Sequence, residues 1–300
     1  MPLVVVGSIA YDSIKTPHGE AQDTLGGSAV YFSLAASTFT QVRLVGVVGT
    51  DFRASDTEFL AGRDIDTQGM ETVSGGETFR WSGEYSPDMN DRETLSVDLN
   101  VFEDFEPKLP ASYRDSRFVF LANGSPVTQL SVLDQVDSVE FVMADSMDLW
   151  IQTQRDELIA LLERIDGLLV NDSEALLLTQ QHNVIEAGRR ILGLGPSLVV
   201  IKKGEHGAIL FRGNEIVSLP AFPTSRVLDP TGAGDSFAGA LMGHIASRGE
   251  VSPEVVKEAV AHGVVAASFT VEDFGVASIA GLDRKAAQGR FDEYRSMLTL

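Results

Sequence analysis

The segment Asp229–Gly243, which reads DPTGAGDSFAGALMG, has the residue types and spacing for phosphate chemistry. A proline and two glycines predict a tight turn, and the small residues that recur after it predict a helix beginning at that turn. The first N–H groups of a helix have no partner within the helix and carry its positive dipole end. The backbone of Gly232, Ala233 and Gly234 could therefore hold a phosphate, beside which Asp235 could accept a proton from an attacking hydroxyl.

An aspartate that only caps a core helix would explain an isolated Gly-x-Gly-Asp pattern about as well. The complete string is more specific, because it resembles the signature of the ribokinase-like (PfkB) family of carbohydrate kinases. This resemblance implies that Asp235 is the catalytic base, that Gly232, Ala233 and Gly234 form an anion hole, and that ATP and Mg²⁺ are the cofactors. Further family motifs follow in the expected order along nearly the whole chain.

The acceptor side of the site is predicted near the N-terminus. Asp12 follows the first predicted strand, where α/β proteins place ligand contacts, and the resemblance implies that it accepts hydrogen bonds from substrate hydroxyls. Gly26 and Gly27 match a family glycine pair whose missing side chains let substrate approach the backbone. A solvated loop aspartate and an ordinary glycine turn are the alternatives. Tyr31 stands where sugar kinases of the family commonly have an asparagine, so a nucleoside, a cyclitol and a bulkier sugar all remain open as acceptors.

A third group of candidates lies in the segment TFRWSG, where Arg80 is flanked by Phe79 and Trp81. Strand alternation puts Arg80 on the face opposite the two aromatic residues, and we expect that face to be turned towards the site. Its guanidinium could bind an anionic or polyhydroxyl substrate, although a surface salt bridge explains it as well. Asn90 and Arg92 are weaker candidates of the same kind.

The nucleotide side is predicted from two further strings. Asn171 and Glu174 match the family motif Asn-x-x-Glu, which implies a place near the nucleotide phosphates for Asn171 and water-mediated organisation of Mg²⁺ by Glu174. Helix capping is the alternative. The string KKGEHG at 202–207 by itself predicts a hairpin turn, and the resemblance makes three of its residues nucleotide-binding candidates: Lys203, Gly204 and Gly207.

Two residues before the anion hole are candidates for a cation site. In many relatives a monovalent cation lies behind the anion hole, and the resemblance assigns it here to Asp229 and Thr231 together with a later loop at about 271–278. Oxygen ligands suit such an ion, so K⁺ activation is expected. Two other nucleotide-binding classes are excluded, because the chain has no Walker A motif and no GxGxxG after its first predicted strand.

Composition limits the partners of the protein. A net charge of −20 argues against nucleic acid, and no apolar run is long enough to span a membrane. The chain has no cysteine, hence no disulfide framework, and its N-terminus lacks the basic region of a signal peptide. We expect a cytoplasmic protein that binds small molecules. The acidic excess suggests adaptation to high salt as one hypothesis and plain solubility as the other.

Apolar, β-branched runs alternate with helical patterns, which predicts a mostly parallel sheet with helices on both faces, in a three-layer α/β/α arrangement. The predicted strands are Leu3–Gly7, Leu44–Val48, Phe118–Ala122, Phe141–Ala144, Gly167–Val170, Leu198–Ile201 and Ala208–Phe211. The predicted helices are Ser28–Ser37, Val127–Val136, Leu149–Ile165, Val184–Leu194, Asp235–Ser247 and Pro253–Phe269, the last with Ser252 as N-cap.

One segment departs from this alternation. Between Glu71 and Phe102 the residues alternate at period two with no helix, which predicts an antiparallel excursion from the α/β core. The resemblance implies that this segment and residues 11–22 form a small β-sheet lid over the sugar site, and in the family such a lid often makes a homodimer. We therefore expect a single domain over residues 1–300 with the lid inserted into it.

The sequence as a whole predicts an ATP-dependent phosphotransferase that phosphorylates a hydroxyl of a sugar or related polyol, with Asp235 as general base. Two alternatives remain. One is a nucleoside kinase of the same fold, and the other is a sensor that binds sugar or nucleotide without catalysis. An intact Asp235 weighs against the sensor, since binding alone needs no base.

Overall fold

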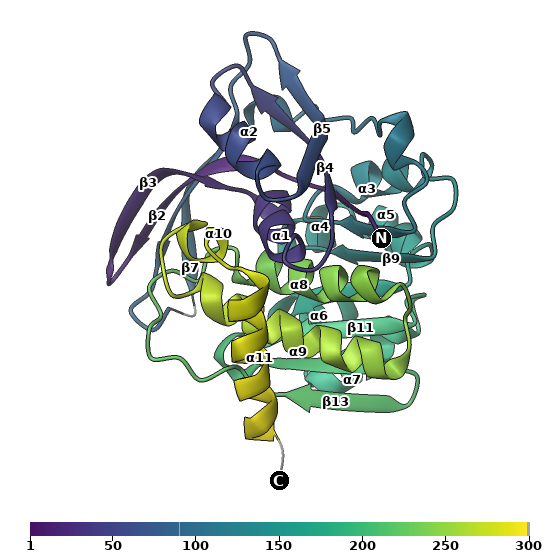
Figure 1. The fold of residues 1–300 in the computed structure, drawn as a ribbon. Helices are drawn as coiled ribbons and strands as arrows, with labels where there is room; N and C mark the ends of the chain where they lie inside the picture. The colour runs from purple at the N-terminus through teal and green to yellow at the C-terminus, as the bar shows by residue number, and fades with distance from the viewer. Residues whose placement is uncertain (90, 299–300) are drawn as a thin grey trace.

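The structure, a computed structural model, describes residues 1–89 and 91–298, so the candidate Asn90 lies outside the described residues. Its main element is a sheet in the order β13-β12-β11-β10-β9-β8-β1-β4-β5 (Figure 1). The strands are β1 (Leu3–Val6), β4 (Val42–Gly49), β5 (Ile65–Val73), β8 (Phe118–Leu121), β9 (Phe141–Asp145), β10 (Gly167–Asn171), β11 (Leu198–Lys202), β12 (Ala208–Arg212) and β13 (Glu215–Leu219). The pairs from β5 to β11 are parallel, and β12 and β13 extend the edge antiparallel.

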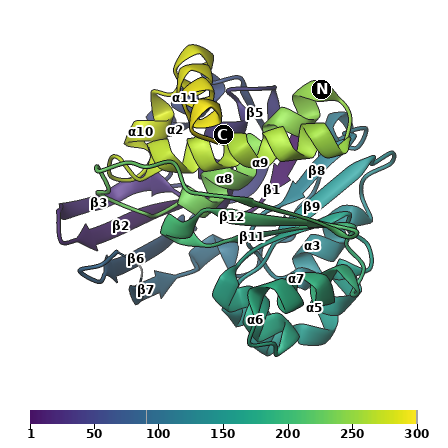
Figure 2. The ribbon, with the colours of Figure 1, turned by 90° about the horizontal axis from the view of Figure 1, so that it is seen from below.

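The central strands are apolar on both faces because both faces are covered. Along β1, Leu3 and Val5 belong to one buried cluster and Val4 and Val6 to another. Continuous burial of this kind is typical of parallel strands between two helical layers. Figure 2 shows these layers on either side of the sheet.

The first cluster packs against the helices α1 (Ser28–Ala36), α8 (Ala233–Arg248), α9 (Pro253–Thr270) and α11 (Arg284–Leu298). The second packs against α3 (Pro126–Leu133), α4 (Asp148–Thr153), α5 (Arg155–Leu162), α6 (Asp172–Thr179) and α7 (Val184–Leu192). The short helices α2 (Ala54–Ala61) and α10 (Ala277–Ala280) and the 3₁₀ turns η1 (Asn100–Phe102), η2 (Ala111–Tyr113) and η3 (Gly204–His206) complete the chain. The predicted three-layer arrangement is therefore confirmed.

The predicted helix Leu149–Ile165 is wrong as a single element. Gln154 has φ −135° and ψ 46°, outside the helical region, and it divides the segment into α4 and α5. The N-cap prediction at the start of α9 holds, because Ser252 Oγ accepts a hydrogen bond from the Val255 N–H at 3.4 Å. No helix among residues 1–89 and 91–298 combines the length and the apolarity that a membrane crossing requires.

A second, four-stranded sheet, the lid, stands beside the main one in the order β3-β2-β6-β7. Its strands are β2 (Ala10–Thr16), β3 (Gly19–Gly26), β6 (Phe79–Tyr85) and β7 (Arg92–Asp98). The predicted boundaries at 71 and 102 are wrong, because 71–73 end β5 in the main sheet and 100–102 form η1. The antiparallel pairing predicted for 71–102 is present between β6 and β7. β2 and β3 also pair antiparallel, whereas β2 and β6 pair in parallel.

Candidate active site

The candidate site lies where three neighbouring strands of the main sheet end. Asp145 is the last residue of β9, Asn171 of β10 and Lys202 of β11, and the register pairs Leu169 with Asp145 and Asn171 with Lys202. The carboxyl ends of adjacent parallel strands are where open α/β sheets bind ligands. These three side chains therefore leave the sheet at one edge, which the N-terminus of α8 approaches from the next layer (Figure 2).

The turn before α8 has the predicted geometry of an anion-binding turn. Gly232 is the N-cap residue with φ +72°, a conformation that favours glycine, and α8 starts at Ala233. The Ala233 N–H donates to the Pro230 carbonyl oxygen at 3.2 Å, so this amide already has a partner inside the turn. A β-carbon at Gly234 would lie 2.9 Å from Lys202 Nζ. The missing side chain of Gly234 thus makes room for a cation beside the helix N-terminus.

Lys202 is a site residue that the sequence analysis missed in favour of its neighbour Lys203. Its positive charge favours the ionised forms of three carboxyl groups and so lowers their pKa values: Asp145, Glu174 and Asp235. Alternation along β11 could have identified it, because Leu198 and Val200 belong to the cluster on the α8 side of the sheet and Lys202 continues their face. Lys203 instead donates its backbone N–H to the Gly207 carbonyl oxygen at 2.7 Å and closes the hairpin.

Asp235 occupies the first turn of α8 and is half-buried. Burial raises the pKa of its carboxyl group, while Lys202 and Arg92 oppose that shift by stabilising the carboxylate. Burial, with a smaller effect of the negative charge of Asp235, raises the pKa of Asp145 well above its ordinary value. Asp145 is 4% exposed, and among the described residues its Oδ1 atom has no hydrogen-bond partner. A polar residue at the end of a buried strand was the sequence signal for Asp145.

Asp12 is held in a buried niche that the glycine pair creates. A β-carbon at Gly26 would lie 2.0 Å from Asp12 Oδ2, and Gly27, with φ +93°, would clash with the Ser8 carbonyl oxygen. The missing side chain of Gly26 therefore makes room for the Asp12 carboxylate, and that of Gly27 makes room for the Ser8 backbone. Burial raises the pKa of Asp12 to about 7; Asp229 and Asp235 add to the increase, and the Gly27 N–H opposes it.

Tyr31 lies between the acceptor residue Asp12 and the turn before α8. Its ring lies against Gly232, where a β-carbon would come within 2.3 Å of it. The phenol is buried, and within the described part of the chain its hydroxyl has no hydrogen-bond partner. Burial raises the pKa of this hydroxyl well above 10, and the charges of Asp12 and Asp229 add to that.

The lid turns the opposite face towards the site from the one predicted. The register of β2 and β6 pairs Asp12 with Trp81, so these two side chains share a face of the lid. Alternation along β6 puts Tyr85 on the same face. The Thr231 hydroxyl donates to the Tyr85 hydroxyl at 3.1 Å, which joins this face to the anion-binding turn. The aromatic residues therefore face the site.

Arg80 lies on the other face, and the prediction that it points into the site is wrong. It pairs with Tyr11 across the sheet and forms ion pairs with Asp51, at 2.8 Å, and with Asp23. The lid cation at the site is Arg92, which pairs with Tyr85 in the register and lies 5.2 Å from the Trp81 ring centroid. Its charge lowers the pKa values of Asp12, Glu174 and Asp235.

Asn171 and Glu174 cap α6, as the alternative given in the sequence analysis predicts. Asn171 Oδ1 accepts the Glu174 N–H, and Glu174 Oε2 accepts the Asn171 N–H, both at 2.7 Å. The cap also fixes the Glu174 carboxylate near Lys202. In residues 1–89 and 91–298, no three His, Asp or Glu side chains gather closely enough to hold a metal directly.

A cavity of about 560 Å³ opens beside the anion-binding turn. Gly204 and Gly207, two of the nucleotide candidates, line it together with Lys202, Ala233 and Gly234. Gly207 has φ +84°, and a β-carbon there would lie 2.0 Å from the Leu219 carbonyl oxygen. The segment 221–230, α8 and α9 supply a largely apolar wall, and Asp88, Met89 and Glu205 also line the cavity. Nucleotide sites have this form, with polar groups at one end and apolar walls at the other.

The segment with the cation candidates is joined to the later loop by Asp229, which is fully buried. Its Oδ1 accepts the Thr231 N–H at 2.9 Å, and its Oδ2 accepts the Gly275 N–H at 2.8 Å. The structure thus brings together the two segments that the sequence analysis associated with a monovalent cation.

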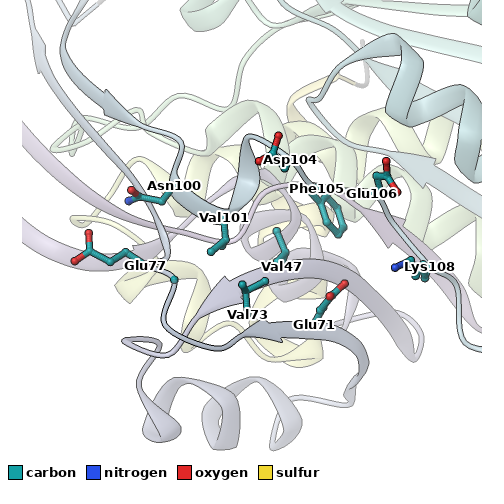
Figure 3. Close-up of a pocket in the computed structure, with 11 residues that line it drawn as sticks. Val47, Glu71, Val73, Glu77, Asn100, Val101, Asp104, Phe105, Glu106 and Lys108 are labelled. Atoms are coloured by element: carbon teal, nitrogen blue, oxygen red, sulfur yellow. The ribbon is translucent and has the colours of Figure 1, made fainter.

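A separate cavity of about 460 Å³ lies behind β5, between Val47, Val73, Val101 and Phe105, with acidic residues at its rim (Figure 3). None of the predicted site residues lines it. It is therefore distinct from the site at Asp235.

The chain matches the model of the pfkB family carbohydrate kinases over residues 2–281. It is 29% identical over 264 residues to a cytidine kinase of Thermococcus kodakarensis, covering 86% of this chain and 92% of that one. It is 26% identical to a nucleoside kinase of Methanothermobacter thermautotrophicus, with 91% and 90% covered, and 25% identical to an inositol 3-kinase of Arabidopsis thaliana, with 91% and 74% covered.

Two solved structures show the same fold. The nucleoside kinase of Methanocaldococcus jannaschii, an archaeal member of the ribokinase family, superposes with a TM-score of 0.78 at 19% identity, covering 97% of this chain and 98% of that one. The nucleoside kinase of Burkholderia thailandensis, in complex with ADP-inosine, gives a TM-score of 0.79 at 17% identity, with 98% and 96% covered.

Proposed function

The chain belongs to the pfkB family of carbohydrate kinases, and we propose that it transfers the terminal phosphoryl group of ATP to a hydroxyl of a nucleoside. The observation that carries the proposal is the position of Asp235, at the N-terminus of α8, beside Lys202 and near the charge of Asp12. A base, an anion-binding turn and an acceptor carboxylate are what such a transfer needs.

In the proposed step, the oxygen of the acceptor hydroxyl bonds to the terminal phosphorus of ATP, and Asp235 accepts the proton of that hydroxyl. The bond from that phosphorus to the bridging oxygen breaks, and ADP leaves with the electron pair. Lys202 and the backbone amides of Gly232 and Gly234 stabilise the negative charge on the transferred group. Burial raises the pKa of Asp235, and the charges of Lys202 and Arg92 oppose that rise, which favours the carboxylate form that acts as the base.

The residues present fit ATP and Mg²⁺. The cavity beside the turn has the cationic end and apolar end that a nucleotide needs. Glu174 and Asp145 offer carboxylate oxygens, the ligands that Mg²⁺ prefers, and the unpartnered Oδ1 of Asp145 is available for a bound water. Mg²⁺ supplies charge neutralisation on the phosphates when it is bound.

A nucleoside is the proposed acceptor because of the lid. Trp81 and Asp12 share the face that covers the site, so one ligand can place a ribose hydroxyl on the carboxylate and an aromatic base against the half-buried indole. Similarity to a cytidine kinase and to nucleoside kinases supports this choice.

The test is ADP release from ATP in the presence of cytidine, the other ribonucleosides, D-ribose or myo-inositol. We expect the highest kcat/KM with a nucleoside. A kcat/KM for D-ribose equal to that for the nucleosides would contradict the nucleoside assignment, but it would still support a kinase activity. Binding of ADP and nucleoside without any ADP release would instead favour the sensor.

Two further expectations remain proposals. K⁺ activation is supported by the contact of Asp229 with Gly275, and it is tested by comparing rates in potassium and choline chloride at equal ionic strength. A homodimer through the lid is supported by the exposed apolar residues Leu95 and Val97 of β7, which are 55% and 49% exposed. Light scattering with and without the change Leu95→Glu would test it.

A further inference from the structure

The apolar end of the nucleotide cavity depends on a segment without regular structure. Between β13 and the turn at Asp229, the chain crosses the cavity as a loop, and Phe222, Pro223 and Thr224 line the wall there. The facing wall is the end of α9, where Ser268 and Val271 line the same cavity. A loop of this kind is positioned by contacts outside the cavity.

Those contacts come from α11, which lies beyond the residues 2–281 that match the family model and packs against α9 (Figure 1). The Tyr294 hydroxyl donates to the Pro220 carbonyl oxygen at 2.5 Å at the start of the loop. One turn earlier, the Arg290 guanidinium lies 3.5 Å from the ring centroid of Phe269 and 5.1 Å from that of Phe222.

The same guanidinium also makes polar contacts that reach both walls. Its Nη1 donates to Ser268 Oγ at 3.1 Å, and its Nη2 forms an ion pair with Glu272 Oε2 at 3.1 Å. The other oxygen of Glu272 accepts the Thr224 hydroxyl at 3.0 Å. The side chains of Arg290 and Glu272 are only 18% and 20% exposed, so water weakens this ion pair less than one at the surface.

We propose that Arg290 is a positioning residue for the phosphoryl donor: from behind the cavity it fastens Phe222 and Thr224 of the loop to Ser268 of α9. The inference rests on the proposed function, because that proposal assigns the cavity to ATP. Arg290 does not line the cavity, so it acts on the nucleotide through the residues it holds. The planar guanidinium stacks on two rings while it donates to two oxygens, which an ammonium group does poorly.

The experiment compares wild type with Arg290→Gln and Arg290→Lys, and with Arg295→Gln as the matched control. Arg295 is on the same helix, and its exposed guanidinium lies 3.9 Å from Asp292 of that helix. ADP binding is measured by calorimetry, and KM for ATP, KM for the acceptor and kcat are measured below the unfolding temperature of every variant.

We expect Arg290→Gln to raise the Kd for ADP and the KM for ATP by about tenfold, the scale of a lost charge-assisted contact with stacking. The KM of Arg290→Gln for the acceptor should stay as in wild type. Arg290→Lys should have a Kd for ADP between those of wild type and Arg290→Gln, and Arg295→Gln should bind ADP as wild type does. Wild-type ADP affinity in Arg290→Gln would overturn the inference alone, as would an equal loss in both KM values. A wild type that binds no ADP would overturn the donor assignment and the inference with it.

Discussion

The ring of Tyr31 lies directly against Gly232, so that a β-carbon at Gly232 would fall 2.3 Å from the ring atoms. This contact connects α1, behind the acceptor niche, to the turn that begins α8. An aromatic ring therefore packs against the turn before α8. Tyr31 stands where sugar kinases of the family commonly have an asparagine.

The first prediction concerns this contact. Gly232→Ala should lower the free energy of unfolding by about 1–3 kcal/mol and abolish most activity, because the positive φ and the ring both oppose a side chain. Gly249→Ala is the control: Gly249 has φ +68° at the other end of α8, near only the flexible end of Met1. Chemical denaturation and ADP release measure the two effects, and normal turnover in Gly232→Ala would refute the role of this turn.

The second prediction tests the base. Asp235→Asn should lower kcat by about 10² or more, the scale for loss of a general base, while ADP binding stays nearly intact. Calorimetry and steady-state rates separate the two quantities. Turnover close to that of the wild type in this variant would rule out Asp235 as the base.

The third prediction concerns pH and the acceptor. Because the pKa of Asp12 is raised to about 7, its carboxylate is ionised above that pH and protonated below it. KM for the acceptor should therefore rise by about tenfold between pH 8 and pH 6 if the ionised form accepts the hydroxyl hydrogen bonds. A flat KM profile in wild type would argue against this role.

The raised pKa of Asp12 also affects stability. Since the folded state binds the Asp12 proton more tightly than the unfolded state does, the contribution to stability is full below about pH 4 and is lost as the pH rises through 7. Asp12→Asn should accordingly have a higher Tm than wild type above pH 7, although it binds the acceptor poorly.

The fourth prediction compares the two lid arginines. Arg92→Gln should lower kcat/KM for the acceptor by about tenfold or more, because its charge acts on Asp12 and Asp235. Arg80→Gln removes the ion pairs with Asp23 and Asp51 and should change kcat/KM much less. The reverse order of effects would mean that the lid turns its other face inward during catalysis.

The fifth prediction concerns a buried histidine of α9. His262 stacks on Phe291 with ring centroids 3.9 Å apart, and burial, with a smaller effect of His244, lowers its pKa to about 3. The unfolded chain therefore binds this proton more tightly, so the contribution of His262 to stability is full above pH 6.5 and is lost as the pH falls towards 3. Between pH 7 and 5 the loss is about 2 kcal/mol.

Urea unfolding of wild type and His262→Phe at both pH values checks this prediction. His244, which forms a pair with Glu258 at 3.4 Å, is present in both proteins, so the difference between them reports His262 together with its interaction with His244. Parallel pH profiles for the two proteins would show that His262 does not cause the loss.

Local rules were sufficient where a feature depends on neighbours in the chain. The turn before Asp235 and the helix after it follow from glycine conformations and helix capping, and α8 begins within two residues of the prediction. Lys202 could also have been found locally, since it continues the alternation of Leu198 and Val200. The break at Gln154 gave no comparable signal, because its neighbours suit one continuous helix.

The sequence by itself determined the α/β class, the glycine turn before Asp235, and the order of the family motifs, because short-range geometry and residue type govern them. Only the tertiary structure decided that Trp81 and Arg92, and not Arg80, face the site, and that β5 belongs to the main sheet. Alternation fixes which residues of a strand share a face. Which face is turned inward depends on pairing with distant strands, here β2 with β6 and β4 with β5, and no local pattern encodes that choice.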